Sequence, residues 1–480
     1  MSRLVVVSNR VPLPSERGPR AGGLAVALAD ALRSGALWFG WSGKRSGHPS
    51  ITPSLQRADG VTYATIDLSE AEYRAFYVSF SNGALWPLLH FRLGLVSFRS
   101  EDYEGYRAVN RRFAASLAPL LQPDDLVWVH DYHLLPLGAE LRALGVTNRI
   151  GFFLHTPFVP PAILHALPRA AELLTCLCTY DVIGFHTRTY RAAFLECVAE
   201  ILGVHPDGEG RFIWRGNPVS AIVDPIGIDA DAFAKTAAEA ARGPETAQLH
   251  ESLAGRTLAI GVDRLDYSKG LVNRFEAIGR LFAKYHEHRR QVSFLQIAAR
   301  SREDQGHYQR LRRELDRIVG DTNGRYSEFD WVPLRYMTRT VRRNTLAGFY
   351  RMARLAVVTP LRDGMNLVAK EYVAAQDPND PGVLVLSRFA GAADEMTEAL
   401  IVNPFDGDEI ADAMHVGLSM ELEERRERWK ALRDTVWNTT ANRYCAVFLA
   451  HLSQTEAQRV PWIPDPAGAL SLAGTPLTDA

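Results

Sequence analysis

The chain has 480 residues, of which 47% are hydrophobic and 23% are charged, a balance typical of a globular protein of more than one domain. Its net charge of −1 gives no global reason to expect binding to nucleic acid or to an anionic membrane, so an anionic ligand must be attracted locally. The four cysteines lack metal-binding spacing, and the sequence shows neither a secretory signal nor an apolar span of bilayer length, which predicts a cytoplasmic protein with reduced thiols.

Short apolar runs recur along the chain, separated by segments of helix length. In the first half they cover residues 4–7, 126–129 and 150–154, and in the second half residues 257–264, 292–299, 353–360, 383–387 and 399–403. This pattern predicts an α/β protein with two Rossmann-like, doubly wound domains that face each other across a cleft. We expect an N-terminal domain at 1–240, a C-terminal domain at 241–459 with its final helices packed back on the first, a hinge near 235–255 that closes on ligand, and a flexible tail at 460–480.

Polar residues follow these runs, where the carboxyl ends of parallel strands place ligands. In the second half, Arg264 and Lys269 follow one run and Asp363 follows another, just before a helix that starts near Leu367 and carries Glu371. Two cations and the amides of a helix start suit a nucleotide diphosphate, and Glu371 suits the hydroxyls of a ribose. Taken singly, each residue also fits an ordinary loop, helix cap or surface ion pair.

A metal site is the alternative interpretation of several acidic and histidine residues. His130, Asp131 and His133 could be metal ligands, although no fourth ligand is evident. Two Asp-x-Asp pairs, which begin at Asp229 and Asp406, resemble metal-chelating pairs but precede helical segments and are better explained as helix caps. We therefore predict no metal and no cofactor.

An ordered series of segments resembles the trehalose-6-phosphate synthase family along residues 3–450. Its members include SNR (8–10), FSNGALWPLLH (80–90), VWVHDYHLLPL (127–137), GFFLH (151–155), RLDYSKG (264–270) and PLRDGMNLVAKEYVAAQDP (360–378). The resemblance implies a GT-B arrangement and transfer of glucose, with retention, from a nucleotide sugar, usually UDP-glucose, to glucose 6-phosphate. The resemblance implies that the partners are these small-molecule substrates. Whether the chain forms a homo-oligomer is left open.

The resemblance also assigns residues to the two substrates. Arg264 and Lys269 would hold the diphosphate, Asp363 the glucose hydroxyls and His155 the region of the 6-hydroxyl. The donor-binding set comprises Gly22, Gly23, Arg264, Lys269, Val341, Asp363, Gly364, Met365, Asn366, Leu367, Val368 and Glu371. The acceptor-binding set comprises Arg10, Tyr77, Trp86, Asp131 and Arg302. Arg264, Lys269, Asp363, His155 and Asp131 form the expected catalytic set.

Two departures from the family pattern leave the acceptor open. Residues 155–160 read HTPFVP where HIPFP is usual, and residues 298–302 read AARSR, which adds Arg300. Alternatives are glycerol 3-phosphate or a pseudo-sugar phosphate as acceptor, or a non-catalytic sugar-phosphate sensor. For an enzyme, we favour front-face displacement over a covalent intermediate on Asp363, because the resemblance assigns Asp363 to hydroxyl binding.

Overall fold

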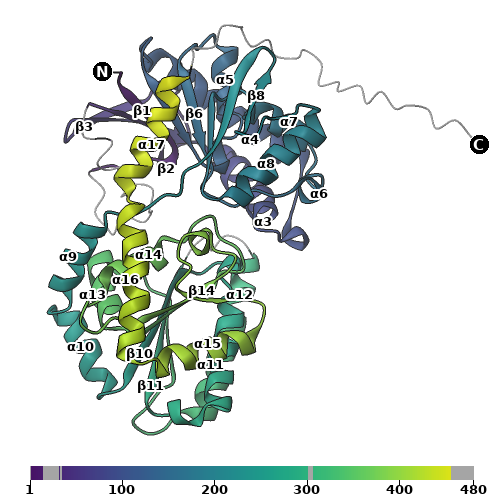
Figure 1. Cartoon of the computed structure of the whole chain (residues 1–480). Helices are drawn as coiled ribbons and strands as arrows, with labels where there is room; N and C mark the ends of the chain where they lie inside the picture. Colours follow the sequence, from purple (N-terminus) through teal and green to yellow (C-terminus); the bar gives the residue numbers. More distant parts are fainter. Residues whose placement is uncertain (1, 15–31, 33–34, 301–305, 456–480) are drawn as a thin grey trace, which may run out of the picture.

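The computed structural model describes residues 2–14, 32, 35–300 and 306–455. It has two lobes, each built around a mainly parallel sheet with helices on its faces (Figure 1). The predicted class, α/β with two Rossmann-like domains, is confirmed. The predicted tail at 460–480 lies outside the described residues.

Within the described residues, the first lobe holds a nine-stranded sheet in the order β3-β4-β2-β1-β5-β6-β7-β9-β8. The β3–β4 and β8–β9 pairs are antiparallel and the other pairs are parallel. Its strands are β1 (Leu4–Arg10), β2 (Leu37–Arg45), β3 (Ser54–Ala58), β4 (Val61–Leu68), β5 (Leu126–His130), β6 (Arg149–Phe153), β7 (Val182–Phe185), β8 (Arg211–Trp214) and β9 (Asn217–Val223).

The second lobe holds a fully parallel six-stranded sheet, again within the described residues, in the order β12-β11-β10-β13-β14-β15. Its strands are β10 (Thr257–Arg264), β11 (Val292–Ala299), β12 (Leu334–Met337), β13 (Leu355–Val358), β14 (Val383–Ser387) and β15 (Leu400–Val402). The residues of β13 and β14 are all buried, as expected for parallel strands covered on both faces.

Helices cover both sheets. Those that follow first-lobe strands are α2 (Glu70–Glu72), η2 (Tyr73–Leu85), α3 (Trp86–Leu89), η3 (Leu93–Leu95), α4 (Ser100–Leu117), η4 (Ala118–Leu120), η5 (Tyr132–Leu134), α5 (Leu137–Ala143), α6 (Pro161–Leu164), α7 (Ala170–Leu177) and α8 (Arg188–Leu202). The later ones are α9 (Ala230–Ala240), α10 (Pro244–Leu253), η6 (Tyr267–Lys269), α11 (Leu271–Lys284), η7 (His286–His288), α12 (Gly306–Tyr326), α13 (Arg343–Met352), α14 (Leu367–Ala375), η8 (Gly391–Asp394), α15 (Gly407–Ser419), α16 (Leu422–Asn438) and α17 (Ala441–Gln454). None of the helices in the described ranges combines the length and the hydrophobicity needed to span a bilayer.

The chain passes between the lobes twice. After β9, helix α9 packs on α13 and α14 of the second lobe, so the chain leaves the first sheet at Val223, ahead of the limit expected at 240. It returns between α16 and α17, two successive helices that run along both lobes (Figure 1). In α17, Phe448 stacks on Trp128 of β5 with ring centroids 4.5 Å apart.

The two crossing segments touch each other at Gly227. A Cβ atom there would lie 1.6 Å from the carbonyl oxygen of Thr439, so only glycine allows the approach. Nearby, the Lys370 ammonium donates to the carbonyl oxygen of Ile226 at 3.0 Å and pairs with Glu395 at 2.8 Å. Helix α14, which carries Lys370, is therefore tied directly to the junction of the lobes.

Both Asp-x-Asp pairs prove to be helix caps. Asp229 accepts a hydrogen bond from the amide of Ala232 at the start of α9, and Asp406 accepts from the amides of Asp408 and Glu409 at the start of α15. The capping interpretation of these two aspartates is confirmed.

Candidate functional site

Two cations lie at the carboxyl edge of the second sheet. Strand β10 ends at the exposed Arg264, and a short turn then brings Lys269 back toward β13. The turn depends on Gly270, which has φ +64° and whose Cβ atom, if present, would lie 2.2 Å from the carbonyl oxygen of Thr359. The backbone therefore fixes Lys269 beside the segment that follows β13.

Asp363, in that segment, is the partner of Lys269. The Lys269 Nζ lies 2.5 Å from the Asp363 Oδ2, and the Asn366 amide donates to the same oxygen at 3.0 Å. Burial raises the pKa of Asp363, but the charge and hydrogen bond of Lys269, assisted by His90 and Arg264, outweigh it and hold the pKa below its usual value. Asp363 is consequently a buried, ionised carboxylate.

Helix α14 begins three residues later than an Asp363 cap would place it. Asn366, with φ +82°, is the N-cap and accepts from the amide of Ala369 at 3.4 Å. The alternative that Asp363 is a plain cap of this helix is wrong, because Asn366 is the cap and the Asp363 carboxylate pairs with Lys269. Leu367 and Val368 are the first helical residues, whose amides have no acceptor within the helix.

Glu371 lies one turn further along α14, where its carboxylate accepts from the Arg343 guanidinium at 2.9 Å. Burial raises the pKa of Glu371 and the nearby Arg343 charge opposes the shift. Val341, two residues before the start of α13, packs partly buried against the same apolar cluster as α14. Arg343 of α13 thus links Glu371, the expected ribose contact, to the segment that carries Val341, the expected base contact.

The first lobe contributes aromatic side chains to its contact with the second lobe. Tyr77 of η2 stacks on His133 at 5.7 Å, and Trp86 of α3 packs against Tyr132 at 5.5 Å. The Arg264 guanidinium lies over the Trp86 ring, 5.5 Å from its centroid. The expected acceptor platform and the expected diphosphate cation are therefore in direct contact across the two lobes.

Two buried residues at this contact between the lobes, one from each lobe, were missed from the sequence. Asp266, fully buried, accepts from the Trp86 indole at 3.4 Å and from the Tyr308 hydroxyl at 3.1 Å. His90 bonds to the Trp86 carbonyl oxygen at 2.8 Å, and burial lowers its pKa to about 4. Both residues lie inside the segments that carry the family resemblance, which was the available signal.

His155 and Asp131 follow neighbouring strands of the first sheet. The His155 amide donates to Asp131 Oδ1 at 3.3 Å, and its Nε2 lies 3.0 Å from the Nδ1 of His130. Burial lowers the pKa of His155 to about 3, so the imidazole is neutral at physiological pH. Among the described residues, the ligand atoms of His130, Asp131 and His133 do not gather into a group that could hold one ion.

The lobes also meet at Gly364. A Cβ atom on Gly364 would lie 1.9 Å from the carbonyl oxygen of His155, and the Tyr190 hydroxyl donates to the carbonyl oxygen of Asp363 at 2.9 Å. The backbone at 363–365 is thereby pressed against the strand ends of the first sheet.

The remaining predicted residues of the donor and acceptor sets are only partly described. Arg10 ends β1, and its guanidinium packs beside Gly43, while its backbone is in register with Trp41, whose ring contacts Tyr77 at 6.0 Å. Gly22, Gly23 and Arg302 lie outside the described residues.

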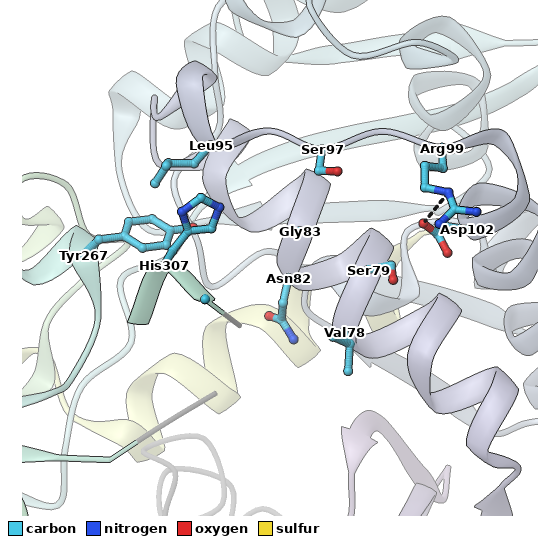
Figure 2. Close-up of a pocket in the computed structure, with 11 residues that line it drawn as sticks. Val78, Ser79, Asn82, Gly83, Leu95, Ser97, Arg99, Asp102, Tyr267 and His307 are labelled. Atoms are coloured by element: carbon cyan, nitrogen blue, oxygen red, sulfur yellow. Dashed lines mark ion pairs between the residues drawn. The ribbon is translucent and has the colours of Figure 1, made fainter. Parts of the chain in front are cut away.

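An interlobe cavity of about 320 Å³ lies beside the loop of Arg264 and Lys269. Figure 2 shows Tyr267 and His307 of the second lobe at one end and the Arg99–Asp102 ion pair of the first at the other, with Asn82 between them. None of the predicted site residues that the structure describes lines this cavity.

The chain matches the model of Glycosyltransferase family 20 over residues 2–454. The chain belongs to this family. It is 48% identical over 457 residues to a trehalose-6-phosphate synthase of Sinorhizobium fredii, covering 94% of this chain and 98% of that one.

Solved structures of family members are also similar to the chain. An alpha,alpha-trehalose-phosphate synthase (UDP-forming) from Burkholderia xenovorans in complex with glucose-6-phosphate has a TM-score of 0.91 at 45% identity, covering 94% of this chain and 100% of that one. A structure from E. coli bound with UDP-2-fluoro glucose has a TM-score of 0.90 at 45% identity, covering 95% and 100%. This family 20 chain is therefore a glycosyltransferase with the trehalose-phosphate synthase fold.

Proposed function

We propose that this family 20 enzyme transfers glucose from UDP-glucose to glucose 6-phosphate, giving α,α-trehalose 6-phosphate and UDP. The observation that carries the proposal is the contact between the lobes, where Arg264 lies over Trp86 and Lys269 pairs with Asp363. The named relatives and the two ligand-bound structures support the identity of both substrates.

On the donor side, Arg264 and Lys269 bind the diphosphate and the amides at the start of α14 add partial positive charge. The glucose hydroxyls contact the backbone of Gly364, Met365 and Asn366. The Glu371 carboxylate exchanges its hydrogen bond with Arg343 for hydrogen bonds with the ribose hydroxyls. The backbone near Val341 meets the base, and the turn at Gly22 and Gly23 closes over the sugars.

On the acceptor side, Arg10, Tyr77 and Arg302 bind the phosphate. Charge-assisted hydrogen bonds contribute about 1.5–3 kcal/mol each, so this pocket selects a phosphorylated sugar over free glucose. Trp86 packs on the sugar ring and Asp131 binds its hydroxyls.

The transfer proceeds by front-face displacement. The bond from the anomeric carbon to the diphosphate oxygen breaks while a bond to the acceptor's anomeric oxygen forms on the same face. The proton of the acceptor hydroxyl passes to the departing diphosphate, whose growing charge is stabilised by Arg264 and Lys269. Neutral His155 contributes a hydrogen bond to the donor sugar without adding a charge.

Donor binding must also loosen the ion pair between Lys269 and Asp363. The two side chains lie 2.5 Å apart, so a diphosphate oxygen has to share or replace this contact. Asp363 is then free to accept from glucose hydroxyls, which couples recognition of the sugar to recognition of the diphosphate.

A panel of nucleotide sugars against phosphorylated acceptors, with the product identified by NMR, tests the proposal. We expect the highest kcat/KM with UDP-glucose and glucose 6-phosphate and an α,α linkage in the product. Turnover with glycerol 3-phosphate alone would replace the acceptor assignment, and binding without turnover of any pair would identify a sensor.

No cofactor or metal takes part in the proposed mechanism, and chelator treatment should leave turnover unchanged. We place the enzyme in the cytoplasm, in keeping with its four buried cysteines, which suit a reducing compartment. A homo-oligomer remains a prediction that sedimentation can test.

A further inference from the structure

Two histidines and a glutamate converge on the second lobe, away from the site described above. His288 and Glu287 belong to η7, which follows α11, and His415 belongs to α15. The Nε2 of His288 lies 2.9 Å from the Nδ1 of His415, and that Nδ1 lies 3.6 Å from a Glu287 carboxylate oxygen. One ligand atom from each residue lies within 4.8 Å of the other two.

The spacing is close to that of a tetrahedral metal centre. With Zn–N distances of 2.0–2.1 Å, two ligand atoms in a tetrahedron lie about 3.3 Å apart. The two nitrogens, 2.9 Å apart, need to separate by a few tenths of an ångström, and the Glu287 oxygen needs to approach the His415 Nδ1 by about as much from 3.6 Å. Imidazole and carboxylate are ordinary ligands of divalent transition metals.

Neighbouring side chains hold His415 in place. Its ring stacks on that of Tyr285 with centroids 3.8 Å apart and planes 2° apart, and the Tyr285 hydroxyl donates to Asp412 at 2.9 Å. Lys284 donates to the same Asp412 oxygen at 2.5 Å. Such supporting contacts fix the orientation of a metal-binding imidazole.

The Glu287 side chain is 60% exposed, so the fourth position faces solvent and can be filled by water.

We propose that Glu287, His288 and His415 form a site for one divalent transition-metal ion, such as Zn²⁺, that ties η7 to α15. Helices α11 and α15 pack against each other in the second lobe (Figure 1). Lys269 lies next to the start of α11 and this site follows its end, 14 residues along the helix or about 21 Å away. The ion is therefore structural, and its binding can be measured independently of glucosyl transfer.

The test is titration of the chelator-treated full-length protein with zinc chloride, followed by calorimetry and thermal unfolding. We expect one Zn²⁺ per chain and a higher unfolding temperature in its presence. His415→Gln and Glu287→Gln should each weaken binding about tenfold or more and remove the thermal shift, since each deletes one of three protein ligands.

The matched control is His286→Gln. His286 is exposed, precedes Glu287 and bonds to the carbonyl oxygen of Ala283 at 2.9 Å, outside the cluster. It should bind zinc as the unchanged protein does. Equal affinity in His415→Gln and the unchanged protein, or an equal loss in His286→Gln, would overturn the proposal, whatever the transferase activity of these variants.

Discussion

Replacing Lys269 with methionine isolates the contact on which the donor site depends. Methionine keeps the length of the side chain but removes its charge, while the Asn366 side chain still donates to the Asp363 carboxylate at 3.0 Å. The two charged side chains are 11% and 14% exposed, and removing one partner of a buried pair costs about 3–5 kcal/mol. The residual exposure and the Asn366 bond place Lys269→Met near the lower end, at about 3 kcal/mol.

The stability lost in Lys269→Met should also depend on pH, because the mutation changes the pKa of Asp363. In the unchanged protein the pKa of Asp363 is depressed, so its stabilising contribution is present above the unfolded pKa, about 3.9, and is lost as pH falls through the folded value. Without Lys269, burial raises the pKa of Asp363 above its unfolded value. Stability then falls as pH rises through the new folded value, and the deficit is larger at pH 7 than near pH 4.

Urea unfolding at both pH values measures the deficit, and the double variant Lys269→Met/Asp363→Asn is the control. Neutralising Asp363 should restore most of the lost stability while glucosyl transfer remains at least about 100-fold reduced, because the diphosphate cation is still missing. A deficit that is equal at both pH values, or a double variant less stable than Lys269→Met, would refute the reasoning.

Three further changes probe the two walls of the site. Arg264→Ala should lower kcat by one to two orders of magnitude, roughly, with little change in thermal unfolding since the side chain is exposed; a loss below about threefold would contradict its role. Glu371→Gln should raise KM for UDP-glucose about tenfold, while Glu245→Gln, which breaks the exposed pair with Arg342, should leave KM unchanged. Gly364→Ala should lower both the unfolding temperature and kcat, because its Cβ atom would lie 1.9 Å from the His155 carbonyl oxygen; unchanged values of both would show that the lobes do not meet there.

The sequence predicted the strand ends well, for a simple physical reason. Parallel strands buried on both faces read as apolar runs, so the polar residues that end them stand out, and Arg264, Lys269 and Asp363 were found in this way. The roles of these residues are still predictions, but the structure does bring them together.

Long-range contacts set the limits of prediction. A helix cap at Asp363 is one of the alternatives that the local pattern allows, and only the fold reveals that the carboxylate pairs with Lys269, 94 positions away. Asp266 and Trp86 are 180 positions apart, so their contact has no local signature. The alanine-rich stretch near 235–255, where we expect a hinge, contains the end of α9 and the whole of α10, and its closure on ligand stays a prediction.

The central claim is that Arg264 and Lys269 of the second lobe bind the diphosphate, and that a pocket of the first lobe binds the acceptor phosphate opposite them. A crystal structure with UDP and glucose 6-phosphate tests it most directly. We predict that the Arg264 guanidinium and the Lys269 ammonium lie within hydrogen-bond distance of the diphosphate, with the acceptor phosphate on Arg10 and Tyr77. A diphosphate bound away from both cations would contradict the account.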